Sequence, residues 1–219
     1  AVCENFLSIP PATMTDSAAD PSPDAPARRR PQPGERRMQI LQALAAMLEQ
    51  PGGERVTTAA LAARLQVSEA ALYRHFASKA QMFEGLIGFI EDAVFSLVNQ
   101  ITAQGGDPLR QAQRVVAVLL QFAERNPGLC RVLAGDALVL EHERLRQRMN
   151  LFFDKLEAAL RQMLREAPGV VDSPAPTVEA RVRAAVLMAF AEGRLQQFVR
   201  SGYRRLPTEA LDAALARLG

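Results

Sequence analysis

Residues 57–83, TTAALAARLQVSEAALYRHFASKAQMF, decide the fold. A hydroxyl side chain stands before each of three helix-forming runs, at Thr57, Ser68 and Ser78, where its oxygen can accept a hydrogen bond from a backbone N–H group. The short breaks QVS and ASK separate the runs. This pattern predicts two short helices joined by a tight turn, followed by the start of a longer helix. That is the form of a helix-turn-helix, whose second helix enters the major groove of DNA.

Apolar and polar residues of this stretch have separate predicted roles. Leu61, Leu65, Val67 and Leu72 stand where a three-helix core needs apolar side chains, and Phe76 is expected to join them. The polar side chains between them are then left to project from the surface.

Those projecting residues are the candidate DNA contacts. The first residues of the second helix lie where base edges are reached, and an alanine there can touch a thymine methyl group. Hydroxyl and ammonium groups suit phosphate oxygens. The expected set is Thr57, Thr58, Ser68, Glu69, Ala70, Tyr73, Arg74, His75 and Lys79. An alternative role for Tyr73 and His75 is to pack the end of the helix, and for His75 the two roles are equally supported.

Residues 1–34 are predicted to form a disordered arm. Seven prolines fall between Pro10 and Pro33, which is incompatible with a helix. Residues 1–13, before Met14, have neither the charged start nor the apolar run of a signal peptide, and we interpret them as a non-native extension. The arm ends in Arg28, Arg29 and Arg30, which are expected to follow DNA into the minor groove; a solvated tail is the alternative.

Charge is unevenly distributed along the 219 residues, although the net charge is only +2. Residues 1–27 carry four acids and no cation, whereas residues 28–80 carry nine cations and four acids. The remaining residues are nearly neutral. A basic segment on a neutral protein indicates a polyanionic partner at that end.

The rest of the chain is predicted to be helical, so the fold class is all-α. Helices are expected from 35 to about 48 and, beyond the motif, over 79–103, 107–124, 129–135, 136–166, 177–201 and 207–218. Apolar residues recur at intervals of three and four, and Gly or Pro separates most of the segments. We divide the chain into a DNA-binding domain, 35–80, and a regulatory and dimerisation domain, 81–219.

The residue inventory argues against an enzyme. The two histidines are 67 positions apart, and no phosphate-binding loop, dinucleotide-binding glycine pattern or paired-cysteine metal site is present. No catalytic residue, metal or cofactor is therefore expected. Cys130 is predicted to be a buried thiol, which fits a reducing cytoplasm. No apolar run is long enough to predict a membrane span.

The motif resembles the N-terminal domain of the TetR family of regulators. The shared pattern is the threonine start, the small apolar helix, Val-Ser, the Tyr-X-X-Phe ending and a lysine that opens the fourth helix. This resemblance implies about nine helices and a homodimer. The last two long helices would form the dimer interface, here about 177–201 and 207–218, with help from the seventh.

Longer segments resemble the nucleoid occlusion branch of this family, including SEAALYRHFASKAQMFEGLIGFIEDAVF and ERNPGLCRVLAGDALVLEHERLRQRMN. The resemblance covers roughly residues 35–215. It implies a cytoplasmic, nucleoid-associated protein that binds palindromic chromosomal DNA. When bound to DNA, it would antagonise assembly of the division GTPase FtsZ.

The same resemblance implies a groove for FtsZ between the fourth and fifth helices. The matching positions are Phe89, Val118, Gln121, Arg125 and Asn126. Gln121 replaces a glycine of the best-known form, and Leu97 replaces an arginine. From helical geometry alone, Phe89 lies about 60° and 100° from neighbouring stripe residues, at the edge of the apolar face. A core-edge phenylalanine and a partner contact are equally compatible with that position.

Two other functions remain open from the sequence. The first is a small-molecule-responsive transcriptional repressor of the same fold, and the second is an interaction protein whose helix-turn-helix no longer recognises sequence. A body without a ligand-sized cavity would favour nucleoid occlusion over the repressor. Sequence-selective DNA binding would exclude the interaction protein.

Overall fold

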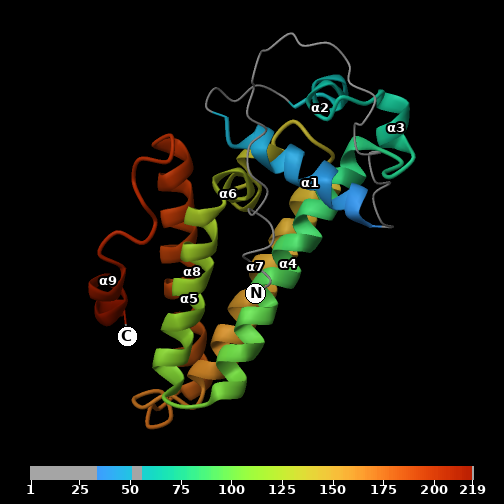
Figure 1. Ribbon diagram of the computed structural model, residues 1–219. Coiled ribbons are helices and arrows are strands. Elements are labelled where there is room, and N and C mark those ends of the chain that lie inside the picture. The colour runs from blue at the N-terminus through green and yellow to red at the C-terminus, as the bar shows by residue number, and fades with distance from the viewer. Residues whose placement is uncertain (1–33, 51–55, 219) are drawn as a thin grey trace, which may run out of the picture.

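The computed structural model describes residues 34–50 and 56–218, and within these ranges the secondary structure consists of helices joined by turns and loops (Figure 1). The helices are α1 Glu35–Leu48, α2 Thr58–Arg64, α3 Glu69–Tyr73, α4 Lys79–Gln104, α5 Pro108–Arg125, α6 Pro127–Leu133, the 3-10 turn η1 Asp136–Leu138, α7 Glu143–Leu164, α8 Pro176–Arg200 and α9 Leu211–Leu218. The all-α prediction is confirmed. Residues 1–33 of the predicted arm, with Cys3, Met14 and Arg28–Arg30, lie outside the described residues.

Side-chain caps set the predicted starts of four helices. The oxygens of Thr57, Ser68 and Ser78 accept hydrogen bonds from backbone N–H groups three residues ahead, at 3.1, 3.2 and 3.2 Å. Asp107 caps α5 through the N–H of Leu109 at 3.3 Å. These bonds satisfy N–H groups that the first turn of a helix leaves without a partner.

Two predicted boundaries are wrong. The helix expected over 136–166 begins only at Glu143, because Asp136 accepts a hydrogen bond from Arg131 at 2.6 Å and stays beside α6. The helix expected from residue 207 begins at Leu211. There the Thr208 hydroxyl donates to Glu124 of α5, and Ala210 has a left-handed backbone with φ 50°. Asp136 and Thr208 are both residue types that favour the start of a helix, but in each case a contact with another helix holds the residue outside the helix that follows.

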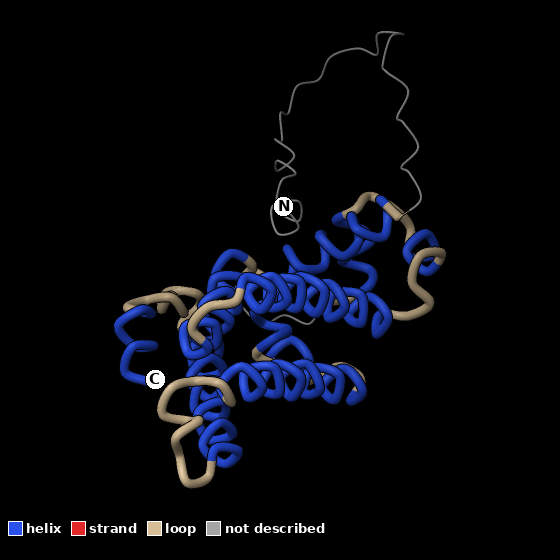
Figure 2. Tube along the Cα trace, turned by 90° about the horizontal axis from the view of Figure 1, so that it is seen from below, coloured by secondary structure: helices blue, strands red, loops and turns tan. Residues whose placement is uncertain are grey.

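Helices α1–α3, the head, lie at one end of the long helices of the body, α4–α9 (Figure 1). In the body α4 packs against α5 and α7, and α8 packs against α5 and α7. Figure 2, seen from below, shows the long helices as neighbouring rods with the head beyond one end. One hydrophobic core runs through both parts, from Ile40 and Leu44 of α1 to Leu187 and Leu195 of α8.

Helix α4 is long and apolar enough to cross a membrane by length and composition, with a mean hydropathy of 1.3, which the sequence reasoning did not foresee. In the structure its apolar stripe, which includes Leu86, Ile90 and Val94, is buried among the other helices. Core helices commonly meet the same length and composition test.

The head is joined to the body where α1 meets α6. Gly128 lies so close to α1 that a Cβ atom there would be 2.0 Å from the carbonyl oxygen of Ala45. The carbonyl of Leu48, at the end of α1, accepts hydrogen bonds from Arg131 at 3.1 Å and from the Tyr203 hydroxyl at 3.5 Å. Burial raises the pKa of Tyr203 to about 12, so this hydroxyl keeps its proton and can donate.

Cys130, also in α6, is fully buried, which confirms the predicted buried thiol. Burial raises the pKa of this thiol to about 12 because the thiolate would lack solvent. The thiolate is the reactive form of cysteine, so Cys130 is a core side chain.

We expect Gly128→Ala to destabilise the protein by about 1–3 kcal/mol, the usual range for overpacking. The new methyl group would collide with backbone atoms of α1, which cannot rotate away. Thermal unfolding followed by circular dichroism measures the effect. Gly88→Ala is the matched control, because its Cβ meets only the flexible end of Arg148, at 3.3 Å. Equal melting temperatures for the two variants would contradict the tight α1–α6 contact.

Candidate nucleic-acid interface

A hydrogen-bonded pair of side chains joins the two helices of the helix-turn-helix, α2 and α3, at their N-terminal ends. The Thr58 hydroxyl, in the first turn of α2, donates a hydrogen bond of 2.5 Å to the Glu69 carboxylate at the start of α3. Behind them Leu61, Leu72 and Phe76 are buried, whereas Leu65 and Val67 are only half-buried at the edge of this core. Thr58 and Glu69 were predicted separately as DNA contacts, and the structure shows that they bond to each other between α2 and α3. DNA contact by either residue stays a prediction.

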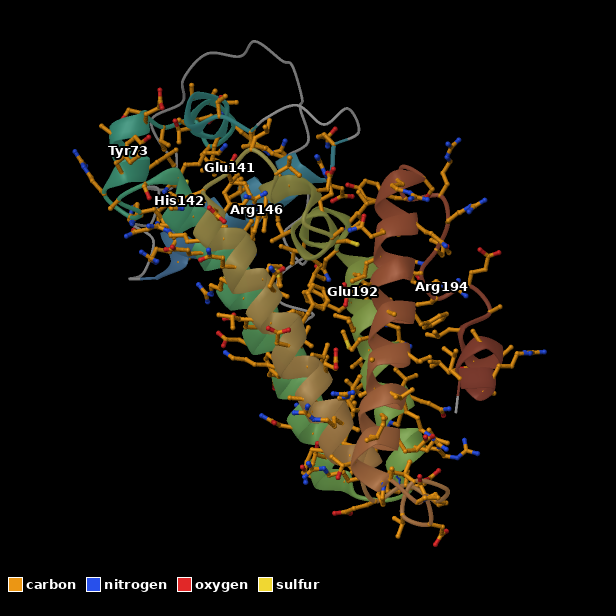
Figure 3. The ribbon with its side chains drawn as sticks, turned by 180° about the vertical axis from the view of Figure 1, so that it is seen from behind. Tyr73, Glu141, His142, Arg146, Glu192 and Arg194 are labelled. Atoms are coloured by element: carbon orange, nitrogen blue, oxygen red, sulfur yellow. The ribbon has the colours of Figure 1, made fainter. Side chains whose placement is uncertain are left out.

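The exposed face of α3 carries several of the predicted contacts. Ser68, Ala70, Tyr73 and Arg74 are exposed, and the Tyr73 side chain is 45% accessible. Figure 3 shows Tyr73 on the outer end of the head, far from the long α8 helix. A small residue at the start of the helix, followed by a phenol and a guanidinium, suits a groove wall and its phosphates.

The other end of α3 is held by Arg37 of α1, which sequence reasoning counted only as part of the basic segment. Its guanidinium donates to the carbonyl oxygen of His75 and lies 4.1 Å from the centre of the Phe76 ring. His75 itself is half-buried. Arg37 therefore supports α3 from behind. The sequence does not indicate this supporting role beyond the position of Arg37 in the head, because its bonding partner His75 is 38 residues away.

Lys79 lies in a different setting from the one expected of a phosphate contact. Its ammonium forms an ion pair with Glu141, and the two side chains are only 19% and 9% exposed. The ammonium also lies 5.5 Å from the centre of the Phe83 ring. Figure 3 shows Glu141 and His142 beside the head, at the start of α7. Phosphate contact by Lys79 stays a prediction. It requires the ammonium either to break its ion pair with Glu141 or to bind Glu141 and a phosphate at the same time.

The positions predicted to form the groove lie on α4, on α5 and just beyond α5. Phe89 and Val118 are half-buried against the core, whereas Gln121 and Arg125 are exposed. Spacings of three and four place Val118, Gln121 and Arg125 on one face of α5. Asn126 differs: it is only 7% exposed, and its amide donates to the carbonyl of Phe122 at 2.7 Å. Its structural role is to join α5 to α6.

The opposite side of α4 is tied to α7. Arg144 and Arg148 of α7 pair with Glu84 and Glu91 of α4 at 2.8 and 2.6 Å. The hydrogen bond that Arg148 donates to Glu91 raises the pKa of Arg148, although burial acts in the opposite direction. These pairs fix the rotation of α4 and leave the edge that carries Phe89 on the side away from α7. Leu97, one of the two departures from the expected groove, is half-buried.

Comparisons with known proteins agree with this arrangement. Residues 40–86 match the model described as "Bacterial regulatory proteins, tetR family", and residues 107–218 match a SlmA-like "Tetracyclin repressor-like, C-terminal domain". The nucleoid occlusion factor SlmA of Idiomarina loihiensis is 51% identical over 178 residues, which cover 81% of this chain and 90% of that protein. The chain belongs to the SlmA family. A second SlmA, from Shewanella frigidimarina, is 52% identical over 177 residues, covering 81% and 89%.

Solved structures confirm the fold of this SlmA-family chain. The regulator FadR from Bacillus subtilis, solved in complex with stearoyl-CoA, covers 83% of this chain and 96% of its own with a TM-score of 0.65. Its sequence is only 15% identical, so the similarity concerns the fold alone. The chain is a TetR-type DNA-binding regulator and not an enzyme.

We expect Glu141→Gln to strengthen DNA binding by freeing Lys79, and Lys79→Ala to weaken it on every sequence. Each additional phosphate that a head binds or releases should change the slope of log affinity against log salt by about 0.9. Fluorescence anisotropy over a salt series measures both effects. Glu143→Gln is the control, since it removes an equal charge two residues away without touching Lys79. If Glu141→Gln weakens binding as Lys79→Ala does, the pair only positions the start of α4.

Proposed function

We propose that this protein is a nucleoid occlusion factor: a homodimer that binds palindromic chromosomal DNA and, in the bound state, antagonises FtsZ assembly. The observation that carries the proposal is about 51% identity to SlmA proteins along 90% of their length, through both head and body. It would act in the cytoplasm, on the nucleoid. The DNA contacts predicted above, including those of the arm, belong to this proposal.

DNA binding is supported by the exposed donors of α3. Palindromic recognition needs two copies of α3 in successive major grooves, about 34 Å apart. A single five-residue helix contacts few base pairs. Binding through both heads adds the contacts of two half-sites, so a monomer should bind far more weakly than a dimer.

Dimerisation is supported by an exposed apolar stripe on α8. Val178, Val182 and Val186 recur every four residues and are 52%, 50% and 42% exposed. Leu151 of α7 is exposed as well, at 56%. Exposed apolar side chains in a row indicate a protein interface. We therefore assign the dimer interface to α7 and α8.

Helix α9 is a poor candidate for that interface, although the family resemblance implied that residues 207–218 take part in it. Two of its leucines, Leu211 at its first position and Leu215, are buried within the protomer. The carbonyl of Leu215 also accepts a hydrogen bond from Gln113 of α5 at 2.9 Å. Helix α9 therefore uses its apolar side to close its own protomer.

The groove for FtsZ is supported by the mixed character of its predicted walls. Phe89 and Val118 offer half-buried apolar surface, and Arg125 adds an exposed cation at the end of α5. Such a surface suits a short segment with apolar and acidic side chains. Gln121 is exposed on the same face, where it gives the segment an amide to hydrogen-bond.

One observation favours a small-molecule-responsive repressor instead. A cavity of about 390 Å³ opens between α7, α8 and the α6–η1 turn. Its size falls within the range of ligand pockets, about 300–1,000 Å³. However, charged and amide side chains line it, including Glu143, Arg146 and Glu192, two of which Figure 3 labels. Ligand pockets are mostly apolar, so nucleoid occlusion remains the better supported function.

FtsZ sedimentation tests the proposal. Polymers of FtsZ should decrease when the protein is added with a duplex that it selected from a random-sequence pool, and less so with a scrambled duplex. Phe89→Ala should keep full DNA affinity and lose most of this effect, because it removes the apolar wall of the groove. An unchanged polymer yield with wild-type protein and selected DNA would refute FtsZ antagonism.

Phe95→Ala is the matched control for Phe89→Ala. Phe95 lies on the same helix and is also half-buried, but its ring packs on Phe152 of α7 at 5.5 Å. It should therefore cost similar stability while leaving the FtsZ effect intact. If both variants lose the effect on FtsZ equally, the loss results from a lower stability of α4, and the assignment of Phe89 to the groove is wrong.

We expect Val182→Glu to convert the dimer into monomers, because it places two carboxylates in an apolar stripe. Sedimentation velocity measures the mass, and DNA affinity should fall at least tenfold when one head must bind alone. Val171→Glu is the control, since Val171 is equally exposed but lies in the α7–α8 loop, outside the stripe. A Val182→Glu variant that remains dimeric would exclude α8 from the interface.

A further inference from the structure

Three arginines gather at the C-terminal end of α8, and none of them belongs to the helix-turn-helix or to the residues predicted to line the groove. Arg200, Arg204 and Arg205 fall within six residues, and all are exposed. Within the described part of the chain, none of them forms an ion pair with a carboxylate. This arginine cluster therefore presents three uncompensated positive charges.

The loop that carries the arginine cluster is rigidly built. The Ser201 hydroxyl accepts hydrogen bonds from the backbone N–H groups of Arg204 and Arg205 at 3.1 and 2.9 Å. Gly202 and Tyr203 both have left-handed backbones, with φ 62° and 65°. A tyrosine adopts this conformation only where its surroundings enforce it. Here its ring packs on Phe198 at 5.2 Å.

The arginine cluster lies at the end of the body that faces the head. The Tyr203 hydroxyl reaches the carbonyl of Leu48 at the end of α1, which fixes the loop beside a helix of the head. Figure 1 shows the C-terminal end of α8 at the same end of the molecule as α1 and α2, while the α4–α5 and α7–α8 turns lie at the other.

The arginine cluster is also aligned with the proposed dimer interface. Arg200 follows Val182 by 18 residues, which is five turns of an α-helix, so both lie on one face of α8. If that face forms the dimer, the two clusters come together near the two-fold axis, between the two heads. The middle of a palindrome passes through that place when each head occupies one half-site.

We propose that Arg200, Arg204 and Arg205 bind the phosphate backbone of the DNA between the two half-sites. Guanidinium groups match phosphate oxygens with paired hydrogen bonds, and phosphate contacts do not depend on base sequence. The inference rests on the proposed DNA-binding dimer and adds a contact made by the body rather than by the helix-turn-helix. The centre of the palindrome would then contribute to the affinity for DNA, but its bases would not be recognised directly.

The test uses the full chain with Arg200→Gln, Arg204→Gln and Arg205→Gln combined, and two duplexes: one selected by wild-type protein from a random pool, and its scrambled version. Affinity should fall on both duplexes. The salt slope should drop by about 0.9 for each phosphate that the variant no longer binds, and by at least about two units for a dimer. Hydroxyl-radical footprinting should show protection lost at the centre and kept at the half-sites.

The matched control combines Arg110→Gln, Arg114→Gln and Arg165→Gln, which removes the same charge at the end of the body remote from the head. The inference is overturned if both triple variants bind alike while wild-type protein still prefers the selected duplex. If wild-type protein shows no such preference, the proposed DNA-binding function fails as well.

Two further measurements distinguish phosphate binding from an acidic protein partner and from misfolding. A triple variant with unchanged salt slope and footprint but no effect on FtsZ would show that the arginine cluster binds an acidic protein segment, and would overturn the inference. Circular dichroism checks folding. If the triple variant is unfolded, Arg204→Gln and Arg205→Gln are tested singly, each with an expected slope change of about one to two units per dimer; no change in either overturns the inference.

Discussion

The contact between the backbones of α1 and α6 is the constraint on which the rest of the structure depends. It exists because residue 128 is a glycine: any side chain would enter the space of the Ala45 carbonyl. Around this contact Arg131 and Tyr203 both donate to the carbonyl of Leu48, an acceptor that the end of a helix leaves without an intrahelical partner. These contacts fix the position of the head relative to the body. For a palindrome-binding dimer this matters, because the distance between two heads must match about 34 Å along DNA.

The same tight packing determines which positive charges are available to DNA. The sequence indicates a basic segment over residues 28–80, but several of its cations stabilise the fold. Arg37 supports α3 through the His75 carbonyl and the Phe76 ring, and Lys79 pairs with Glu141. Arg37 is itself exposed, but among the described residues of the head only Arg64 and Arg74 are exposed arginines without a hydrogen bond or ion pair to another described side chain or carbonyl. Counting the cations of this segment therefore overestimates the positive potential that the head offers to DNA phosphates. Cations of the body become correspondingly more important for DNA binding.

The parts of the fold that could be predicted from the sequence depend on local physics. Thr57, Ser68, Ser78 and Asp107 cap helices through bonds to N–H groups two or three residues away, and periodic apolar residues show which faces are buried. The errors arise where a partner is distant or on another element: Asp136 is held by Arg131 of α6, and Thr208 by Glu124 of α5.

The candidate site shows the same limit. The exposure of Ser68, Ala70, Tyr73 and Arg74 agrees with the place of these residues in the motif, whereas the pairing of Lys79 depends on Glu141, 62 residues later. The amide of Asn126 turns to the carbonyl of Phe122 rather than to solvent. Family resemblance locates a groove, but it does not tell which of its side chains are already engaged within the protomer.

The α1–α6 contact also bears on how DNA would control the action on FtsZ. Arg125 lies three residues before Gly128, so the predicted groove is directly connected to the joint between head and body. A conformational signal along that route requires an element with two discrete arrangements. Backbone packed against backbone, within one continuous hydrophobic core, leaves little room for a second arrangement. The proposed FtsZ antagonism would act on a polymer, and DNA that gathered several dimers would raise their effective concentration toward neighbouring FtsZ subunits without any change of shape. For the proposed function, this rigid joint is more compatible with assembly of several dimers on DNA than with a switch within the protomer.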